Sequence, residues 1–157
     1  MTRKTPLALF APMALALALL SGCAMTGGGG GVDVTRSHLG VPIPANGIHV
    51  ETLTGYAGVG PEDPVYIGAV SAELQRLGFT PGDGETPYIA AVSYKHGDGS
   101  DELDVQIKRR SDNSIVWQGR AVTAARTGTA PGATATRLAN ALFKGFPGQS
   151  GVTITVK

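Results

Sequence analysis

The sequence predicts an α+β domain in which a mixed, mostly antiparallel sheet of about five to six strands is covered on one face by two helices. Three observations predict this fold. Several segments alternate apolar and polar residues, as half-buried strands do. Two other segments space their apolar residues three and four apart, as helices that pack on one side do. These segments follow the order β-β-α-β-β-β-α-β, which favours strands that meet antiparallel.

The first half of the domain is expected to contain two strands and a helix. Residues 32–39 and 48–53 alternate, and each predicts a strand. Asp63 suits the N-cap of a helix, and Pro64 suits its first helical position. The apolar residues that follow recur at helical spacing: Ile67, Val70, Leu74 and Leu77. Residues 80–87 are turn-like and end this half of the domain.

Three further strands are expected in the middle of the chain. Residues 88–94 predict the first, and residues 95–101 after them predict a polar loop. Residues 103–108 alternate, and residues 115–122 return after the turn-like segment 111–114. The last two strands are therefore expected to form a β-hairpin.

A second helix and a final strand are expected to close the chain. Residues 127–134 are rich in Gly, Thr and Ala and predict a long loop. One face of the helix is then formed by apolar residues at helical spacing: Leu138, Ala141, Leu142 and Phe146. Residues 146–148 end the helix, and residues 152–156 alternate as a strand does.

The first 22 residues predict an export signal. Arg3 and Lys4 form a short positive region, and residues 7–20 are apolar apart from Pro12. This stretch is too short to span a bilayer, but it has the length of a signal-peptide core. The segment Leu20-Ser-Gly-Cys23 then resembles the bacterial lipobox, in which small residues let the signal peptidase reach the bond before the cysteine.

Cys23 is the only cysteine, and its place at the cleavage site predicts lipidation. Its thiolate would accept a diacylglyceryl group, and the freed amine would take a further acyl chain such as palmitate, which together anchor a protein stably. Ala24 in place of an aspartate favours the outer membrane, facing the periplasm. Residues 23–31 then form the lipidated cysteine and a Gly-rich tether, and residues 32–157 form one globular domain. The alternative is an ordinary signal peptide with an incidental cysteine.

The charge balance argues against a nucleic-acid partner. The chain has 13 Lys and Arg and 12 Asp and Glu. Arg3 and Lys4 are the only charged residues among the first 22, so the mature chain carries 11 basic and 12 acidic residues, a net charge of −1. No basic excess remains to neutralise phosphates along a nucleic acid.

Four segments near the C-terminus form a pattern: Val116-Trp-Gln-Gly119, Ala141-Leu-Phe143, Phe146-Pro-Gly-Gln-Ser-Gly151 and the final Thr-Ile-Thr-Val156. Together with the lipobox and the short linker, they resemble a family of bacterial lipoproteins catalogued as domain of unknown function 4136. The resemblance covers most of the mature chain and is most specific between Trp117 and Val156. It implies the fold and the location in the cell envelope, and it implies no reaction and no catalytic residues.

The sequence shows no catalytic or metal-binding motif, so no enzyme activity, metal or cofactor is expected. His38 and His49 lie on the two N-terminal strands and could become neighbours in the sheet, whereas His96 lies far from both in sequence. Ser150 lies in Gly-Gln-Ser-Gly. A nucleophile elbow has glycine two residues after the serine, and here that residue is Val152. One acidic cluster could offer oxygens to Ca²⁺, although a solvated loop is the simpler interpretation: Asp98, Asp101, Glu102 and Asp104.

Two features are candidates for contact with a partner. The basic run Lys108-Arg109-Arg110 lies at the tip of the predicted hairpin and could touch anionic lipid or another protein. Trp117 is the only tryptophan. It is expected in the core, and it becomes an interface anchor if it faces outward.

The sequence therefore predicts a membrane-anchored envelope lipoprotein that binds or assembles with other envelope components and is not an enzyme. Two alternatives stay open. A module that binds a small molecule or lipid would need an apolar cleft between the sheet and the helices. A periplasmic hydrolase would draw on His38, His49, Ser150 and the acidic loop.

Overall fold

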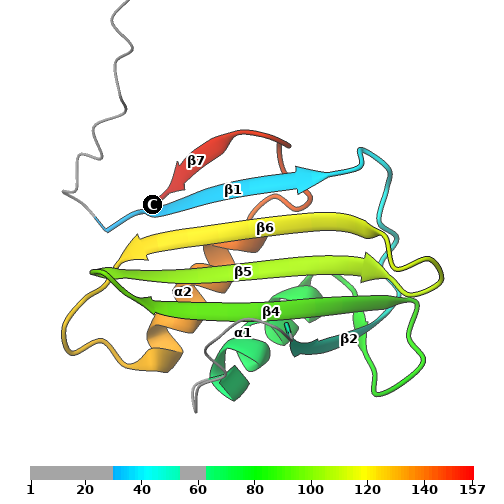
Figure 1. The fold of residues 1–157 in the computed structure, drawn as a ribbon, viewed down its shortest axis with the longest axis horizontal. Coiled ribbons are helices and arrows are strands. Elements are labelled where there is room, and N and C mark those ends of the chain that lie inside the picture. The colour runs from blue at the N-terminus through cyan, green and yellow to red at the C-terminus, as the bar shows by residue number, and fades with distance from the viewer. Residues whose placement is uncertain (1–29, 54–62) are drawn as a thin grey trace, which may run out of the picture.

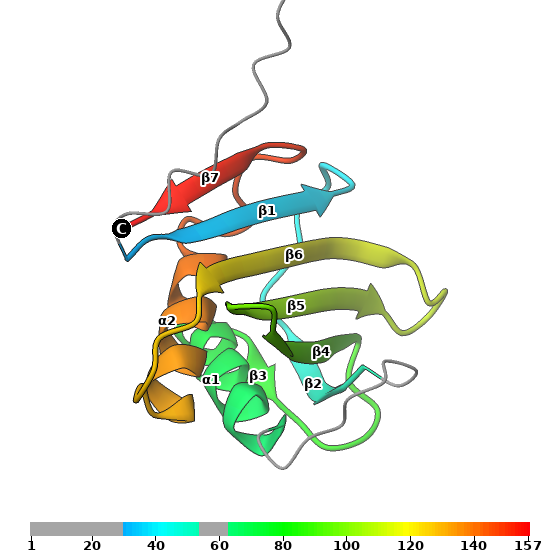
Figure 2. The ribbon, with the colours of Figure 1, turned by 60° about the vertical axis from the view of Figure 1, so that its left-hand side comes forward.

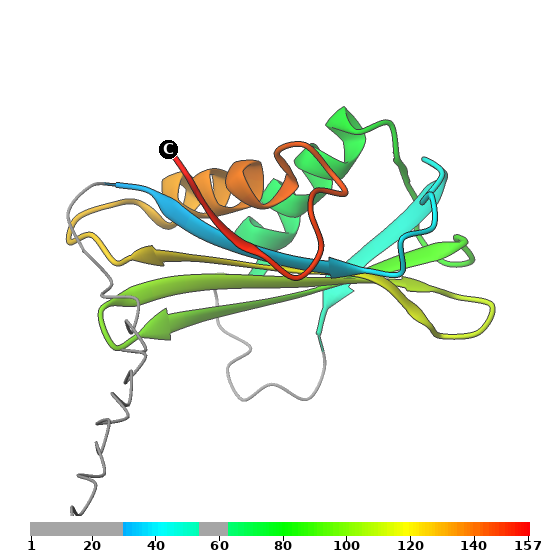
Figure 3. The ribbon, with the colours of Figure 1, turned by 90° about the horizontal axis from the view of Figure 1, so that it is seen from above.

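In a computed structural model, which describes residues 30–53 and 63–157, the chain forms a seven-stranded sheet with two helices on one face (Figure 1, Figure 3). The α+β class is thereby confirmed. The signal peptide, Cys23 and the tether up to residue 29 lie outside the described residues. The elements follow in this order: β1 (Val32–His38), β2 (Gly47–Thr52), α1 (Asp63–Arg76), β3 (Thr80–Pro81), β4 (Tyr88–Gly97), β5 (Ser100–Arg109), β6 (Ile115–Ala124), α2 (Pro131–Phe143) and β7 (Thr153–Val156).

The strands lie side by side in the order β3-β2-β4-β5-β6-β1-β7, with β1 and β7 at one edge (Figure 2). β4, β5 and β6 form an antiparallel meander, and β1 pairs antiparallel with both β6 and β7. β2 is parallel to β3 and β4, because α1 carries the chain back between them. The sheet is mixed and mostly antiparallel, but the expected five to six strands are too few. The two-residue β3 lies within the predicted turn 80–87.

The expected polar loop at residues 95–101 is wrong. β4 continues to Gly97, and β5 begins at Ser100. Between them, Asp98 and Gly99 have φ angles of 51° and 74°. Two successive positive φ angles are what a tight hairpin turn between twisted strands requires, and Asp-Gly is a preferred pair for it. The acidic residues after this turn therefore lie in β5 and not in a loop that could wrap a calcium ion.

The second helix begins earlier and ends earlier than predicted. α2 begins at Pro131, inside the expected loop 127–134, because proline has the φ angle of a first helical turn. It ends at Phe143, since Lys144 is extended and Gly145 has a φ angle of 70°. Phe146 is thus not part of the helix, although it still packs against the core.

The core fills the space between the sheet and the helices. Trp117 on β6 is fully buried, and its ring lies 5.3 Å from the rings of Phe143 and Phe146, measured between centroids. Gly119 makes room for it, because a Cβ atom there would lie 2.4 Å from Cη2 of Trp117. The expectation that Trp117 belongs to the core is confirmed, so it is not available as a surface interaction residue.

Candidate functional site

The residues of the hydrolase alternative do not form one site. His38 on β1 and His49 on β2 are separated in the sheet by β4, β5 and β6, so the expectation that they become neighbours is wrong. The reason is that β2 pairs with β4 through the α1 crossover, whereas β1 pairs with β6. The Nδ1 atom of His49 lies 3.1 Å from the backbone oxygen of Gly82, which ties it to the opposite edge of the sheet.

His38 and Ser150 do meet at the end of β1, but not as a catalytic pair. The backbone N–H of His38 donates to Oγ of Ser150 at 3.2 Å. The backbone N–H of Gly40 donates to Nδ1 of His38, so Nε2 carries the proton and donates to the backbone oxygen of Gly148 at 3.1 Å. Both ring nitrogens are occupied by backbone groups. The contact fastens the turn before β7 to β1, and it does not prepare a serine hydroxyl for attack.

His96 lies beside the β4–β5 turn in a small cluster. Its Nδ1 lies 2.6 Å from Oδ1 of Asp101, and the hydroxyl of Tyr94 donates to the same oxygen at 2.9 Å. Asp101 is 5% exposed, so it is buried while it holds two side chains of β4 against β5. Among residues 30–53 and 63–157, no group of three or more His, Cys, Asp or Glu is placed to hold a metal ion.

The sheet face opposite the helices is polar and carries one perturbed carboxyl group. Asp104 lies between Ser93 on β4 and Arg120 on β6. Burial, and then the neighbouring Glu102, raise the pKa of Asp104 to about 7, while Arg120 opposes the rise. Arg120 itself donates to the Glu102 carboxylate. Asp104 and Arg120 are among the residues that line a pocket of about 350 Å³.

Asp104→Asn is expected to stabilise the fold at pH 8 by roughly 1 kcal/mol and to change it little at pH 4, once the pKa shift is discounted for solvent screening. The folded carboxyl keeps its proton up to about pH 7, whereas the unfolded one releases it near pH 4. The folded state therefore binds more protons between these pH values, and wild-type stability falls as the pH rises through that window. Urea unfolding of both proteins at pH 4 and pH 8 measures the difference.

Asp83→Asn is the matched control, because Asp83 is an exposed carboxyl in the loop before β4. Its effect should not grow between pH 4 and pH 8. An Asp104→Asn effect of the same size at both pH values would contradict the assignment of the raised pKa to this group.

The basic run 108–110 lies at the β5–β6 hairpin, where the sequence placed it, but much of it is used within the fold. Arg110 donates to two backbone oxygens of the loop 82–87, at 2.6 and 2.8 Å. Arg109 donates to the carboxylate of Asp112 at 3.0 Å. These contacts hold the hairpin against the loop 82–87 and occupy donors of Arg109 and Arg110 that a partner would otherwise use.

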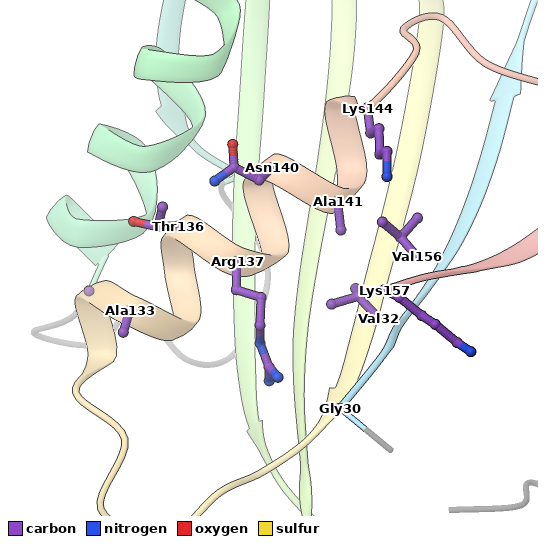
Figure 4. A pocket seen from close by; sticks show the side chains of 11 residues that line it. Gly30, Val32, Ala133, Thr136, Arg137, Asn140, Ala141, Lys144, Val156 and Lys157 are labelled. Carbon is purple, nitrogen blue, oxygen red and sulfur yellow. The ribbon is translucent and has the colours of Figure 1, made fainter. Parts of the chain in front are cut away.

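In the described part of the chain, a groove lies between α2 and the sheet edge formed by β1 and β7 (Figure 4). We call it the α2–β7 groove. Its volume is about 770 Å³, within the range of roughly 300–1,000 Å³ typical of sites that hold a small molecule. Its lining includes four apolar and three cationic residues: Val32, Ala133, Ala141 and Val156, with Arg137, Lys144 and Lys157.

The α2–β7 groove lies where the described domain begins. Gly30 lines it, and a chain of hydrogen bonds fixes the next residue. Arg137 donates to Oγ1 of Thr123 at 2.9 Å, and that hydroxyl donates to the backbone oxygen of Gly31 at 3.1 Å. The start of the domain, the end of β6 and the middle of α2 are thus held together beside the groove.

The groove was not predicted from the sequence. The sheet–helix interface, where a cleft was expected if the domain binds a small molecule, is filled by the core, and the groove lies at its margin. Arg137 and Lys144 are seven residues apart, the spacing of two cations on one side of a helix, and Lys144 directly follows the last residue of α2. That signal is present in the sequence. That β1 and β7 face these cations could be known only from the strand order of the sheet.

Solved structures of other proteins share the fold. PelC from Paraburkholderia phytofirmans, solved as a dodecamer, matches with a TM-score of 0.51 and 14% identity over 70% of this chain and 94% of that chain. A PDZ domain protein from Parabacteroides distasonis matches with a TM-score of 0.54 and 9% identity over 79% of this chain and 38% of that chain. At such identities the similarity establishes the fold alone.

Sequence comparison adds little to this. No family model matches the chain, so the resemblance to domain of unknown function 4136 stays a prediction. A stretch of 58 residues is 43% identical to an uncharacterized protein of Zymomonas mobilis. That stretch covers 35% of this chain and only 22% of that protein. Within the described residues, no helix is both long and apolar enough to cross a membrane.

Proposed function

We propose that the chain is a lipid-anchored protein of the bacterial cell envelope whose domain acts by binding or assembly and not by catalysis. The observation that carries the proposal is the position of the α2–β7 groove beside Gly30. The sequence upstream of this residue contains the lipobox that ends at Cys23. An acylated Cys23 would hold this end of the domain near a membrane, with the groove next to the anchor. Ala24 favours the outer membrane.

Replacing Cys23 with alanine is expected to abolish acylation completely, because alanine has no thiol to accept the diacylglyceryl group. Labelling of growing cells with a radioactive or clickable palmitate, followed by capture of the protein, measures this directly. Separation of the inner and outer membranes then tests the location. Ser21→Ala is the matched control, because it keeps a small residue before the cleavage site and should leave the label in place. An unlabelled wild type would refute the anchor.

Assembly is the first of two uses that the geometry supports. β7 is the outer strand of the sheet, and an outer strand presents unpaired backbone groups to which another chain can add. Val152 and Ile154 beside this edge are 46% and 40% exposed. PelC, which has a similar fold, forms a dodecamer. Crosslinking in intact cells should therefore give multimers of the chain or an envelope partner, and a species lost in Cys23→Ala would depend on the anchor.

Binding of a small molecule or lipid is the second use, and the volume and mixed lining of the α2–β7 groove favour it. If crosslinking yields no partner with either wild type or Cys23→Ala, this second use gains support. The hydrolase alternative has no comparable support, because Ser150 meets the backbone of His38 and not its ring.

A further inference from the structure

We infer that the α2–β7 groove binds the anionic headgroup of a phospholipid in the membrane that carries the anchor. The inference deepens the binding role proposed above. It rests on the proposed acylation of Cys23, which would bring the groove close to membrane phospholipids. The chemistry of recognition comes from the groove itself, namely its charges, its apolar wall and its distance from the anchor.

The groove is electrostatically suited to an anion. Arg137 lies in α2, and Lys144 directly follows its last residue. Seven residues at the helical rise correspond to about 10 Å, a separation that two long side chains can close around one phosphate. Figure 4 shows them at the two ends of the gap between α2 and the sheet edge. No Asp or Glu side chain lines the groove, and neither cation is ion-paired with a carboxylate in the described part of the chain. A guanidinium is the side chain best matched to a phosphodiester.

The wall between these cations is apolar. Val32 and Ala141 are 2% and 4% exposed, and Val156 is half-buried beside them. Hydrocarbon gains free energy when it covers exposed apolar surface, and among these three residues Val156 supplies it, because Val32 and Ala141 are already covered by the core. A small hydrated anion gains nothing from such a surface. The combination therefore favours an amphiphile, with its phosphate between the cations and the start of its acyl chains against the wall.

The distance to the anchor places the groove at the headgroup layer. Gly30 follows Cys23 by seven residues, and a fully extended chain of this length spans at most about 25 Å. The acyl chains on Cys23 would enter the bilayer, so the groove beside Gly30 cannot lie far from its surface. The hydroxyl of Thr123 links the backbone of Gly31 to Arg137, and this keeps the groove next to the point where the chain from Cys23 enters the domain.

The test is a calorimetric titration of the full chain, purified in non-ionic detergent whether or not it carries acyl groups, with the short-chain lipid dihexanoyl phosphatidylglycerol. The wild type should bind it, and Arg137→Gln/Lys144→Gln should bind at least about tenfold more weakly, because each lost charge-assisted hydrogen bond costs roughly that factor. Lys108→Gln/Arg109→Gln is the matched control. It removes two cations from the β5–β6 hairpin and should bind as the wild type does.

Two further ligands test whether the charge and the acyl chains of the lipid both contribute to binding. Dihexanoyl phosphatidylcholine should bind clearly more weakly, and inorganic phosphate should not bind measurably. Equal affinity for both lipids would overturn the role of the cations, and tight binding of inorganic phosphate would overturn the lipid assignment. Equal loss in the groove and hairpin variants would also overturn the site. Because the lipid is supplied in solution, the titration can succeed or fail independently of the acylation experiment on Cys23.

Discussion

Replacing Arg36 with methionine is expected to lower the free energy of unfolding by about 3 kcal/mol. Arg36 is on β1 and is only 3% exposed. Its Nε donates to the backbone oxygen of Leu142 at 2.8 Å, and its Nη2 donates to those of Ala141 and Lys144 at 2.9 and 3.0 Å. These oxygens lie at the C-terminal end of α2, where the last carbonyls lack partners within the helix and the helix dipole is negative.

Methionine is a suitable replacement because it fills a similar space without donating a hydrogen bond. Three carbonyls would lose their donor, two in buried and one in a part-buried hydrogen bond, and each unsatisfied buried polar group costs about 1–3 kcal/mol before the structure relaxes. Burial lowers the pKa of Arg36, so part of this loss is offset because a buried charge is removed as well. Urea unfolding followed by circular dichroism measures the change.

Arg109→Met is the control for the loss of an arginine as such. Arg109 pairs with Asp112 at the surface, and its replacement should change stability by less than about 1 kcal/mol. Arg36→Lys should fall between the wild type and Arg36→Met, because an ammonium keeps the charge but cannot match the fork of the guanidinium. Equal stability of Arg36→Met and wild type would show that water replaces the arginine at the helix end.

Local patterns in the sequence predicted the elements well. The alternation of residues 103–108 correctly assigned Leu103, Val105 and Ile107 to the core, because strand periodicity depends only on neighbouring residues. Asp63 and Pro64 marked the start of α1 for the same reason. The Asp98-Gly99 turn was also visible, but the polar residues around it suggested a loop where two long strands in fact meet.

The arrangement of the strands could not be predicted in this way. β1 pairs with β6 and β7, which are separated from it in sequence by most of the domain. Such pairings depend on which apolar faces pack together, and periodicity within one segment carries no information about them. The α2–β7 groove exists only because β1 and β7 lie next to α2. Its residues could be recognised as cationic or apolar from the sequence, but not as one site.

Replacing Trp117 with alanine is expected to cost about 4 kcal/mol, the largest loss among the substitutions considered. Trp117 is fully buried, and its ring contacts those of Phe143 and Phe146. Its Nε1 also donates to the backbone oxygen of Pro147 at 3.0 Å. The side chain therefore joins β6, the end of α2 and the segment that leads into β7. Circular dichroism must follow the unfolding, since the variant lacks the only tryptophan.

Trp117→Phe separates the two contributions. Phenylalanine keeps an aromatic ring against Phe143 but leaves the oxygen of Pro147 without its donor, so the loss should be about 1–3 kcal/mol.

Hydrogen exchange in β7 should accelerate in both variants, because the hydrogen bond to Pro147 holds the segment that positions this strand. If Trp117→Phe is as unstable as Trp117→Ala, the hydrogen bond and not ring packing dominates. If exchange in β7 is unchanged, the strand is held by its pairing with β1 alone, and the wall that Val156 gives to the groove does not depend on Trp117.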